Sequence, residues 1–341
     1  PSRLLSPCDS VAEPRGSSRA LGRHNYEMSD PERIRGLCKA WLGAAQKPDG
    51  ALAIGANTEQ HRLHRNGIAF HALSIDELRA ACLGLSEVLL LPGMNTIIDL
   101  DHQLFWAWIG QLLLAPGADV FGDQEREIAE LFAVCIRASL AGIRPPSSSR
   151  DEWEAQNRKF HIEESNAREL VQHAQLVLAF LALPLLEAVA KKSANEYVDY
   201  SGAVLQPWSV PSKGGGTRTY SPSGGSPRCN SVRDLLRLLH DTVAGPELRT
   251  GLDEIRAIFQ RRDPSVEAFD AIYGWRNQAL HGETTHPTIG GTVLNIAILI
   301  ALEFVSSDYE VRRDRQLEQC RWEQRVSSGG TRSPWSYYPP F

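Results

Sequence analysis

Apolar residues recur at helical spacing along most of the chain, and this pattern predicts a mostly helical protein. Over residues 124–140 the apolar side chains return every three or four positions, as on one face of a helix: Ile128, Leu131, Phe132, Cys135 and Ile136. Similar spacing predicts helices at residues 31–46, 101–114 and 150–194, the last broken near Ser165. Asp101 is the expected N-cap of the second of these. The short stretches 51–54 and 68–73 fit either strands or loops.

The last third of the chain carries four further helical segments. Ser231 is the expected N-cap of a helix over 232–242, and further helices are predicted over 246–262, 263–281 and 287–305. For the third, Asp263 is the candidate N-cap and Pro264 the first helical residue. The fourth is apolar nearly all round from 293 to 305, so we expect it to be buried on several sides. Four such helices over residues 229–326 predict a helical bundle.

Composition changes mark the expected domain boundaries. Residues 201–228 are rich in Gly, Pro and Ser, which predicts a flexible linker or long loop between a helical region at 29–200 and the bundle. The glycines there lack the strand, helix and Gly-Lys context of a phosphate-binding loop. Residues 1–28 and 327–341 lack periodicity and are predicted to be a disordered arm and tail. The fold class is therefore all-α.

The net charge and the cysteines indicate which kinds of partner and which cellular compartment suit the protein. A formal net charge of -5 over 341 residues argues against a broadly basic surface that coats nucleic acid. The six cysteines are widely scattered, which favours reduced thiols in a cytoplasmic protein over a disulfide framework or zinc site. No apolar run reaches the roughly 18 residues of a membrane span. The nearest one, 176–190, contains Pro184 and Glu187 and predicts a kinked core helix.

The residues most suggestive of chemistry lie at 273–282, Tyr-Gly-Trp-Arg-Asn-Gln-Ala-Leu-His-Gly, between two apolar helices. Arg276 falls on the apolar stripe of its helix, where a surface arginine is unusual. Asn277 and His281 are four residues apart and share a face. Arg276 and His281 diverge by roughly 140° at about 100° per residue, so a joint site needs the helix to end near His281 or a second copy of the chain. Gly282 is the expected helix stop.

Spacing alone does not single this motif out. An arginine followed several residues later by histidine occurs five times, at Arg19 and His24, Arg65 and His71, Arg168 and His173, Arg233 and His240, and Arg276 and His281. The last pair differs by its helical context, whereas Arg65 to His71 has the same Arg-Asn start without a capped helix. His61, His64 and His71 invite a metal hypothesis, but solvated loop histidines are the simpler interpretation. We predict no metal and no cofactor.

At Ile272 to Gly282 the chain resembles the HEPN superfamily (higher eukaryotes and prokaryotes nucleotide-binding domains), most closely its Apea-like branch. The resemblance covers about residues 229–326. Ribonuclease members carry this arginine-to-histidine motif at a helix end in a small helical bundle, so the resemblance implies an RNA substrate, a homodimer and a site formed by Arg276, Asn277 and His281. The expected activity is metal-independent RNA cleavage to 2',3'-cyclic phosphate ends, in bacterial defence or as a toxin with an antitoxin or regulatory partner.

Two other hypotheses remain open from the residues alone. The first is a non-catalytic HEPN-like module that binds RNA or a protein partner. The second is a purely structural bundle, in which Arg276 satisfies buried carbonyls or pairs with Glu283 and His281 caps its own helix C-terminus. The most informative single experiment is incubation of the purified protein with labelled RNA in EDTA, wild type beside His281→Ala.

Overall fold

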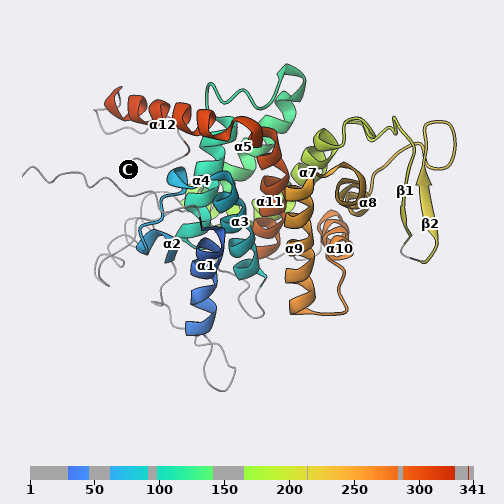
Figure 1. Cartoon of the computed structure of the whole chain (residues 1–341), viewed down its shortest axis with the longest axis horizontal. Coiled ribbons are helices and arrows are strands. Elements are labelled where there is room, and N and C mark those ends of the chain that lie inside the picture. The colour runs from blue at the N-terminus through green and yellow to red at the C-terminus, as the bar shows by residue number, and fades with distance from the viewer. Residues whose placement is uncertain are drawn as a thin grey trace, which may run out of the picture.

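The computed structural model describes residues 30–45, 62–90, 98–140, 165–212, 214–282, 287–326 and 337. Within them nearly all regular structure is helical, which confirms the all-α class (Figure 1). The helices are α1 Pro31–Ala45, α2 Arg62–Arg65, α3 Ile75–Leu89, α4 Leu100–Leu114, α5 Arg126–Leu140, α7 Ser165–Ser193, α8 Val232–Leu238, α9 Pro246–Arg262, α10 Ala268–Leu280, α11 Pro287–Ala301 and α12 Tyr309–Val326. Short 3₁₀ segments at Leu302–Asp308 and elsewhere, and a π-helical turn at Leu239–Val243, extend some of them.

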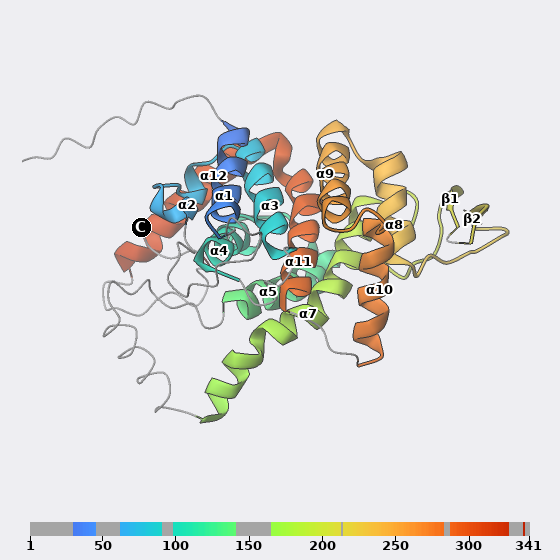
Figure 2. The same ribbon diagram turned by 90° about the horizontal axis from the view of Figure 1, so that it is seen from below.

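Helix α11 is the centre of the molecule. It contacts α7, α3 and α9, and Figure 2 shows it between these helices. The apolar side chains from Val293 to Val305 are at most 1% exposed, except that of Phe304, which is half-buried. A Cβ atom built on Gly290 would lie 2.6 Å from the backbone nitrogen of Ala179 in α7, so a glycine permits the close approach of the two helices. The apolar surface of α11 is thus covered within one chain, and it gives no argument for a dimer.

The hydrophobic core runs through both halves of the sequence. One cluster of buried residues extends from Ile34 to Tyr337, on both sides of the boundary expected at 229. Helix α7 precedes that boundary, yet it packs against α8, α10 and α11. The predicted bundle at 229–326 therefore shares its core with the N-terminal region. The sequence of Thr288–Glu323 has the length and composition of a membrane span, but 83% of its apolar window is buried inside the fold, as in a core helix of a soluble protein.

Several helix boundaries follow the local capping signals. The Ser231 side chain accepts a hydrogen bond from the backbone of Asp234, Pro246 is the first residue of α9, and α11 begins at Pro287. Each of these boundaries confirms the sequence-based prediction. Pro184 lies inside α7 as expected.

Other local predictions were wrong. Helix α10 begins at Ala268 with Glu267 as its N-cap, because the Asp263 carboxylate instead accepts hydrogen bonds from the backbone and hydroxyl of Ser265. The N-cap of α4 is Asp99, which forms a capping box with His102. The Asp101 carboxylate instead accepts hydrogen bonds from the backbone N–H groups of residues 63 and 64 at 2.9 and 3.0 Å.

Two further segments are resolved by the structure. Residues 68–73, which fit either a strand or a loop, contain a 3₁₀ turn at 70–72. Within the expected linker, β1 Trp208–Pro211 and β2 Thr217–Tyr220 pair antiparallel, with Trp208 opposite Tyr220. The predictions for 1–28, 51–54 and 150–164 lie outside the described residues. Of the expected tail, the structure describes Tyr337, which is 7% exposed and packs on α4 at Gly110.

Candidate functional site

Helix α10 ends where the motif requires. The backbone N–H of His281 donates to the carbonyl of Asn277 at 3.1 Å, and the N–H of Gly282 donates to the carbonyl of Ala279 at 3.1 Å. Gly282 has a φ of +74°, in the left-handed region that glycine adopts without strain. The last helical residue is Leu280, which confirms the prediction that the helix stops near His281.

Arg276 faces another helix rather than its own C-terminus. Its Nη2 atom lies 3.6 Å from the Glu187 Oε2 atom of α7, and 27% of its side chain is exposed. The other oxygen of Glu187 lies 2.9 Å from Lys191 Nζ one turn further along α7. The helix itself is fixed by apolar packing, including the ring of Trp275 against that of Phe259 at 5.4 Å between centroids. The guanidinium is thus held by a carboxylate while part of it stays open to solvent.

His281 lies at the open end of the helix. It is exposed and Asn277 is half-buried, and within the described residues neither side chain makes a hydrogen bond or ion pair. Between Arg276 and His281 no hydrogen bond or ion pair is described, consistent with a divergence of roughly 140° over five helical residues. The neighbouring Leu280 is 67% exposed, an unusual place for a large apolar side chain. One chain therefore supplies a guanidinium held by Glu187 and an accessible imidazole, but no described contact links the two side chains.

Glu187 is the residue that sequence reasoning did not place in the site. A carboxylate within the otherwise apolar run 176–190 was the available signal, and its spacing of four from Lys191 predicts the helical ion pair. Its second partner, Arg276, is far away in the sequence. Only the packing of α10 against α7 brings the two together.

The histidines of two other Arg/His pairs contact neighbouring side chains. His71 is half-buried with its ring 6.1 Å from that of Trp108; burial, with Arg321 and Arg313 nearby, lowers its pKa. His240 lies between Asp241 and Asp253, at 2.6 and 2.8 Å.

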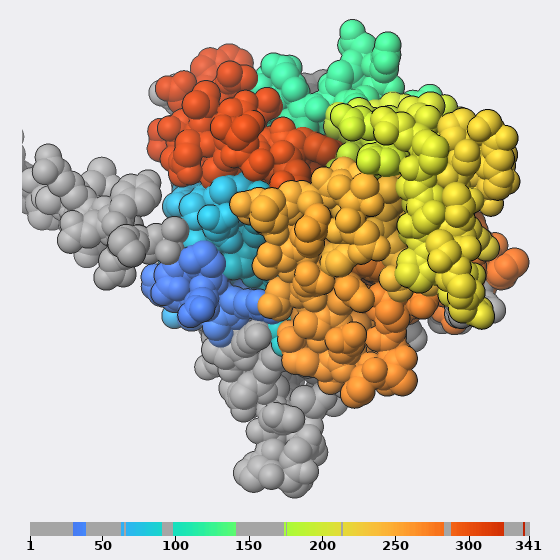
Figure 3. Space-filling view, turned by 45° about the vertical axis from the view of Figure 1, so that its right-hand side comes forward, coloured from blue at the N-terminus to red at the C-terminus, as the bar shows by residue number. Residues whose placement is uncertain are grey.

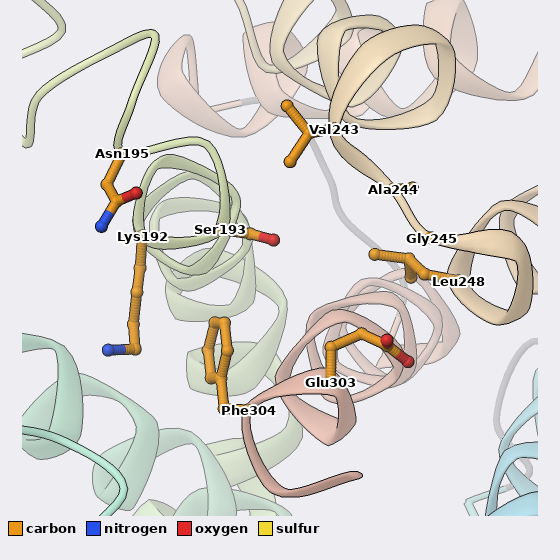
Figure 4. Close-up of a pocket in the computed structure, with 9 residues that line it drawn as sticks. All are labelled: Lys192, Ser193, Asn195, Val243, Ala244, Gly245, Leu248, Glu303 and Phe304. Carbon is orange, nitrogen blue, oxygen red and sulfur yellow. The ribbon is translucent and has the colours of Figure 1, made fainter. Parts of the chain in front are cut away.

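Within the described residues, the motif lines neither of two surface pockets and belongs to no group that could hold a metal ion. Among the described residues, no three His, Cys, Asp or Glu side chains are arranged to hold a metal ion. A pocket of about 390 Å³ is lined by the end of α7, residues 243–245, Leu248 of α9 and the turn after α11 (Figure 4). Lys192 at its edge pairs with Glu125 at 2.5 Å. A second pocket of about 400 Å³ lies between α1, α3 and α9. Arg276, Asn277 and His281 line neither.

No protein-family model, curated protein or solved structure matches this chain.

Proposed function

We propose that this protein is a metal-independent endoribonuclease of HEPN type, with a site formed by Arg276, Asn277 and His281. The observation that carries the proposal is the arrangement at the end of α10. The helix stops at Leu280, so the His281 imidazole is exposed, while Glu187 holds the partly exposed guanidinium of Arg276. A held cation and a free imidazole are the groups that RNA cleavage without a metal requires.

The chemistry assigns a role to each side chain. The 2'-hydroxyl of the ribose loses its proton to a base and its oxygen attacks the neighbouring phosphorus. The bond from phosphorus to the 5'-oxygen breaks, and that oxygen takes up a proton from an acid. The products are a 2',3'-cyclic phosphate and a free 5'-hydroxyl. His281 serves as base or acid, Arg276 stabilises the charge on the phosphorane, and Asn277 orients the phosphate or the imidazole.

A homodimer resolves the shortage of proton-transfer groups. One imidazole cannot easily act as base and acid on opposite sides of the same phosphorus, whereas two copies of the helix end supply two. The exposed Leu280 beside His281 supports contact at this place, because such a side chain gains free energy when it is covered. Each copy would also contribute its own Arg276, so the phosphate would be clamped by two cations.

The cellular setting belongs to the same proposal. The five described cysteines are buried, as suits a cytoplasmic protein: Cys38, Cys82, Cys135, Cys229 and Cys320. Within the cytoplasm the enzyme would act in antiviral defence or as a toxin, with an antitoxin or regulatory protein as its partner.

A binding module without catalysis is the second candidate. The observation that favours it is the His281 side chain, which has no orienting hydrogen bond among the described residues, whereas catalytic imidazoles are normally held by one. This candidate expects RNA or a protein to bind at the helix end without cleavage, and Arg276→Ala to weaken that binding. If the site is purely structural, Arg276→Ala and His281→Ala would mainly lower the melting temperature.

The deciding experiment is incubation of the purified protein with end-labelled RNA in EDTA. We expect cleavage to fragments with 2',3'-cyclic phosphate ends, no cleavage of DNA of the same sequence, and a rate lower by about 10² to 10⁴ in His281→Ala. His64→Ala is the matched control, since His64 is also exposed and lies in α2, outside the motif. Cleavage that persists unchanged in His281→Ala would remove His281 from the mechanism.

A further inference from the structure

Tyr337, in the C-terminal part of the chain, is held against helices of the N-terminal half. It lies eleven residues after Val326, the last residue of α12, and it is 7% exposed. Its ring packs on Gly110 of α4, and the guanidinium of Arg137 on α5 lies over the ring, 5.6 Å from the centroid. Helix α12 contacts α4, as Figure 1 shows, and in Figure 3 α12, in red, forms part of the surface. A ring buried between helices with a cation over it occupies one defined place.

Gly110 leaves the space that the ring of Tyr337 needs. A Cβ atom at Gly110 would lie 2.9 Å from the Cδ1 and Cγ atoms of the ring, and 2.9 Å from the Cγ2 atom of Ile136 on α5. Glycine inside a helix is otherwise unfavourable, because it loses more conformational freedom on folding than any other residue. The close approach of Tyr337 and Ile136 explains why a glycine stands in the middle of α4.

Gln111 binds the backbone of the same residue. Its side chain is fully buried in α4, and its Oε1 atom accepts a hydrogen bond from the backbone N–H of Tyr337 at 3.2 Å. Its Nε2 atom donates to the Oε1 atom of Gln316 in α12 at 3.0 Å, and Gln316 is buried as well. Among the described residues, the N–H of Tyr337 is the only donor to the Gln111 oxygen. Because a buried polar atom costs free energy unless it has a partner, this oxygen is matched to a peptide N–H at this place.

These contacts define a binding site with two requirements, which we call the tyrosine seat. The space above Gly110 takes a flat ring, and the buried oxygen of Gln111 takes a backbone N–H. A single aromatic residue within a peptide segment supplies both groups. Three helices contribute to the seat, through Gly110 and Gln111 of α4, Ile136 and Arg137 of α5, and Gln316 of α12.

We infer that the tyrosine seat is a docking site for an aromatic residue of a peptide segment, and that the segment around Tyr337 of this chain is its resident ligand. The seat shares no residue with the end of α10, so the inference goes beyond the proposed function and holds whether or not the protein cleaves RNA. Because the resident segment is covalently tethered, it competes with a free peptide at an effective concentration of the order of millimolar. A free peptide therefore enters readily only when the resident ring is removed.

The test is binding of a free peptide to the whole chain of 341 residues. The probe is a fluorescein-labelled peptide with the sequence of residues 333–341, Ser-Pro-Trp-Ser-Tyr-Tyr-Pro-Pro-Phe, and fluorescence anisotropy measures its Kd. We expect Tyr337→Ala to bind the peptide, and the wild type to bind it about tenfold more weakly because the resident ring fills the seat. Tyr337→Phe keeps a ring in the seat and should resemble the wild type.

Matched controls locate the binding on both partners. A peptide carrying Tyr337→Ala should not bind the Tyr337→Ala protein, whereas a peptide carrying Tyr338→Ala should still bind it. In the protein, Arg137→Gln added to Tyr337→Ala should weaken binding by about two- to fivefold, because the cation over the ring is lost. Arg126→Gln, at a side chain 81% exposed on the same helix, should leave binding unchanged.

Melting curves establish first that Tyr337→Ala stays folded. If it does not, the wild type still decides the matter, because it should bind the unmodified peptide more tightly than the peptide carrying Tyr337→Ala. Three results would overturn the inference: no binding of the unmodified peptide to a folded Tyr337→Ala protein, equal binding of the two peptides, or equal effects of Arg137→Gln and Arg126→Gln. Binding by the wild type as tight as that by Tyr337→Ala would show that Tyr337 does not occupy the site that the peptide uses.

Discussion

Glu187 of α7 and Arg276 of α10 lie 3.6 Å apart, and they form the only described ion pair of Arg276 among the residues that the structure covers. Both side chains are mostly buried, at 18% and 27% exposed, so the pair is less screened by solvent than a surface pair. Its geometry makes Glu187 a positioning residue for the cation that would stabilise the phosphorane.

Glu187→Gln should lower kcat for RNA cleavage by up to about tenfold with little change in KM, because the guanidinium remains but is no longer held by a charge. Steady-state kinetics on a short RNA measures the two constants separately. Glu196→Gln is the control, since Glu196 is an exposed carboxylate just after the same helix. A loss of melting temperature with unchanged kcat would assign Glu187 a structural role only.

The starts of α8, α9 and α11 and the end of α10 could be predicted from sequence because caps act over a few residues. Ser231 accepts a backbone hydrogen bond at the start of α8, and Pro246 has the fixed φ of a first helical residue. Gly282 adopts the positive φ that ends α10. The start of α10 was mispredicted because two carboxylates four residues apart, Asp263 and Glu267, both suit an N-cap. In the structure the Asp263 carboxylate accepts a hydrogen bond from the backbone of Ser265, and the Glu267 carboxylate accepts one from the backbone of Asp270, so Glu267 is the cap.

Features that depend on distant contacts could not be predicted. The partner of Arg276 lies on α7, and the pairing of β1 with β2 is stabilised by Asp234 and Arg233 of α8. Because the segment is rich in glycine, it was predicted to be a linker or loop and not a hairpin. Gly215 and Gly216 have φ of +88° and +78°, which suits the tight turn between the strands. The candidate residues Arg276, Asn277 and His281 were chosen from the sequence, and their joint action stays a prediction.

Stability should fall as the pH rises, because of a buried histidine in α4. Burial by itself lowers the pKa of His102, but the Asp99 charge, its hydrogen bond at 2.6 Å and the Leu85 carbonyl outweigh burial and raise it. A raised pKa means that the contribution is fully present below the unfolded value of 6.5 and is lost as the pH rises through the folded value.

We therefore expect the melting temperature to decrease above neutral pH. His102→Gln should have a lower melting temperature in acid and a flatter pH dependence, which thermal melts in buffers across this range would measure. His64→Gln serves as the comparison, as an exposed histidine. An identical pH profile for wild type and His102→Gln would contradict the assignment. Asp101, whose pKa burial raises to about 6, adds a loss in the same direction at lower pH.

Two glycine substitutions should have opposite effects on stability. Gly290→Ala places a Cβ atom 2.6 Å from the backbone of Ala179, so α7 and α11 must separate, at a cost of about 1–3 kcal/mol. Gly274→Ala lies within α10 and its Cβ atom meets nothing within 4 Å, so it should stabilise the helix by roughly 0.5–1 kcal/mol. Chemical denaturation of both variants beside wild type measures the difference. Equal effects would show that α7 and α11 do not pack this closely.

The composite site can be tested by mixing active and inactive chains. If cleavage needs His281 from both copies, a dimer with one His281→Ala chain is inactive, whereas independent sites lose only the activity of the mutant chain. An equal mixture, allowed to exchange subunits by co-expression, should keep about a quarter of the activity of wild type at the same total concentration in the first case and about half in the second. Light scattering at micromolar concentration checks the state directly, with and without RNA. A protein that stays monomeric in both conditions, or a mixture that keeps half the activity, would leave each chain to act alone and would require a second proton-transfer group near His281.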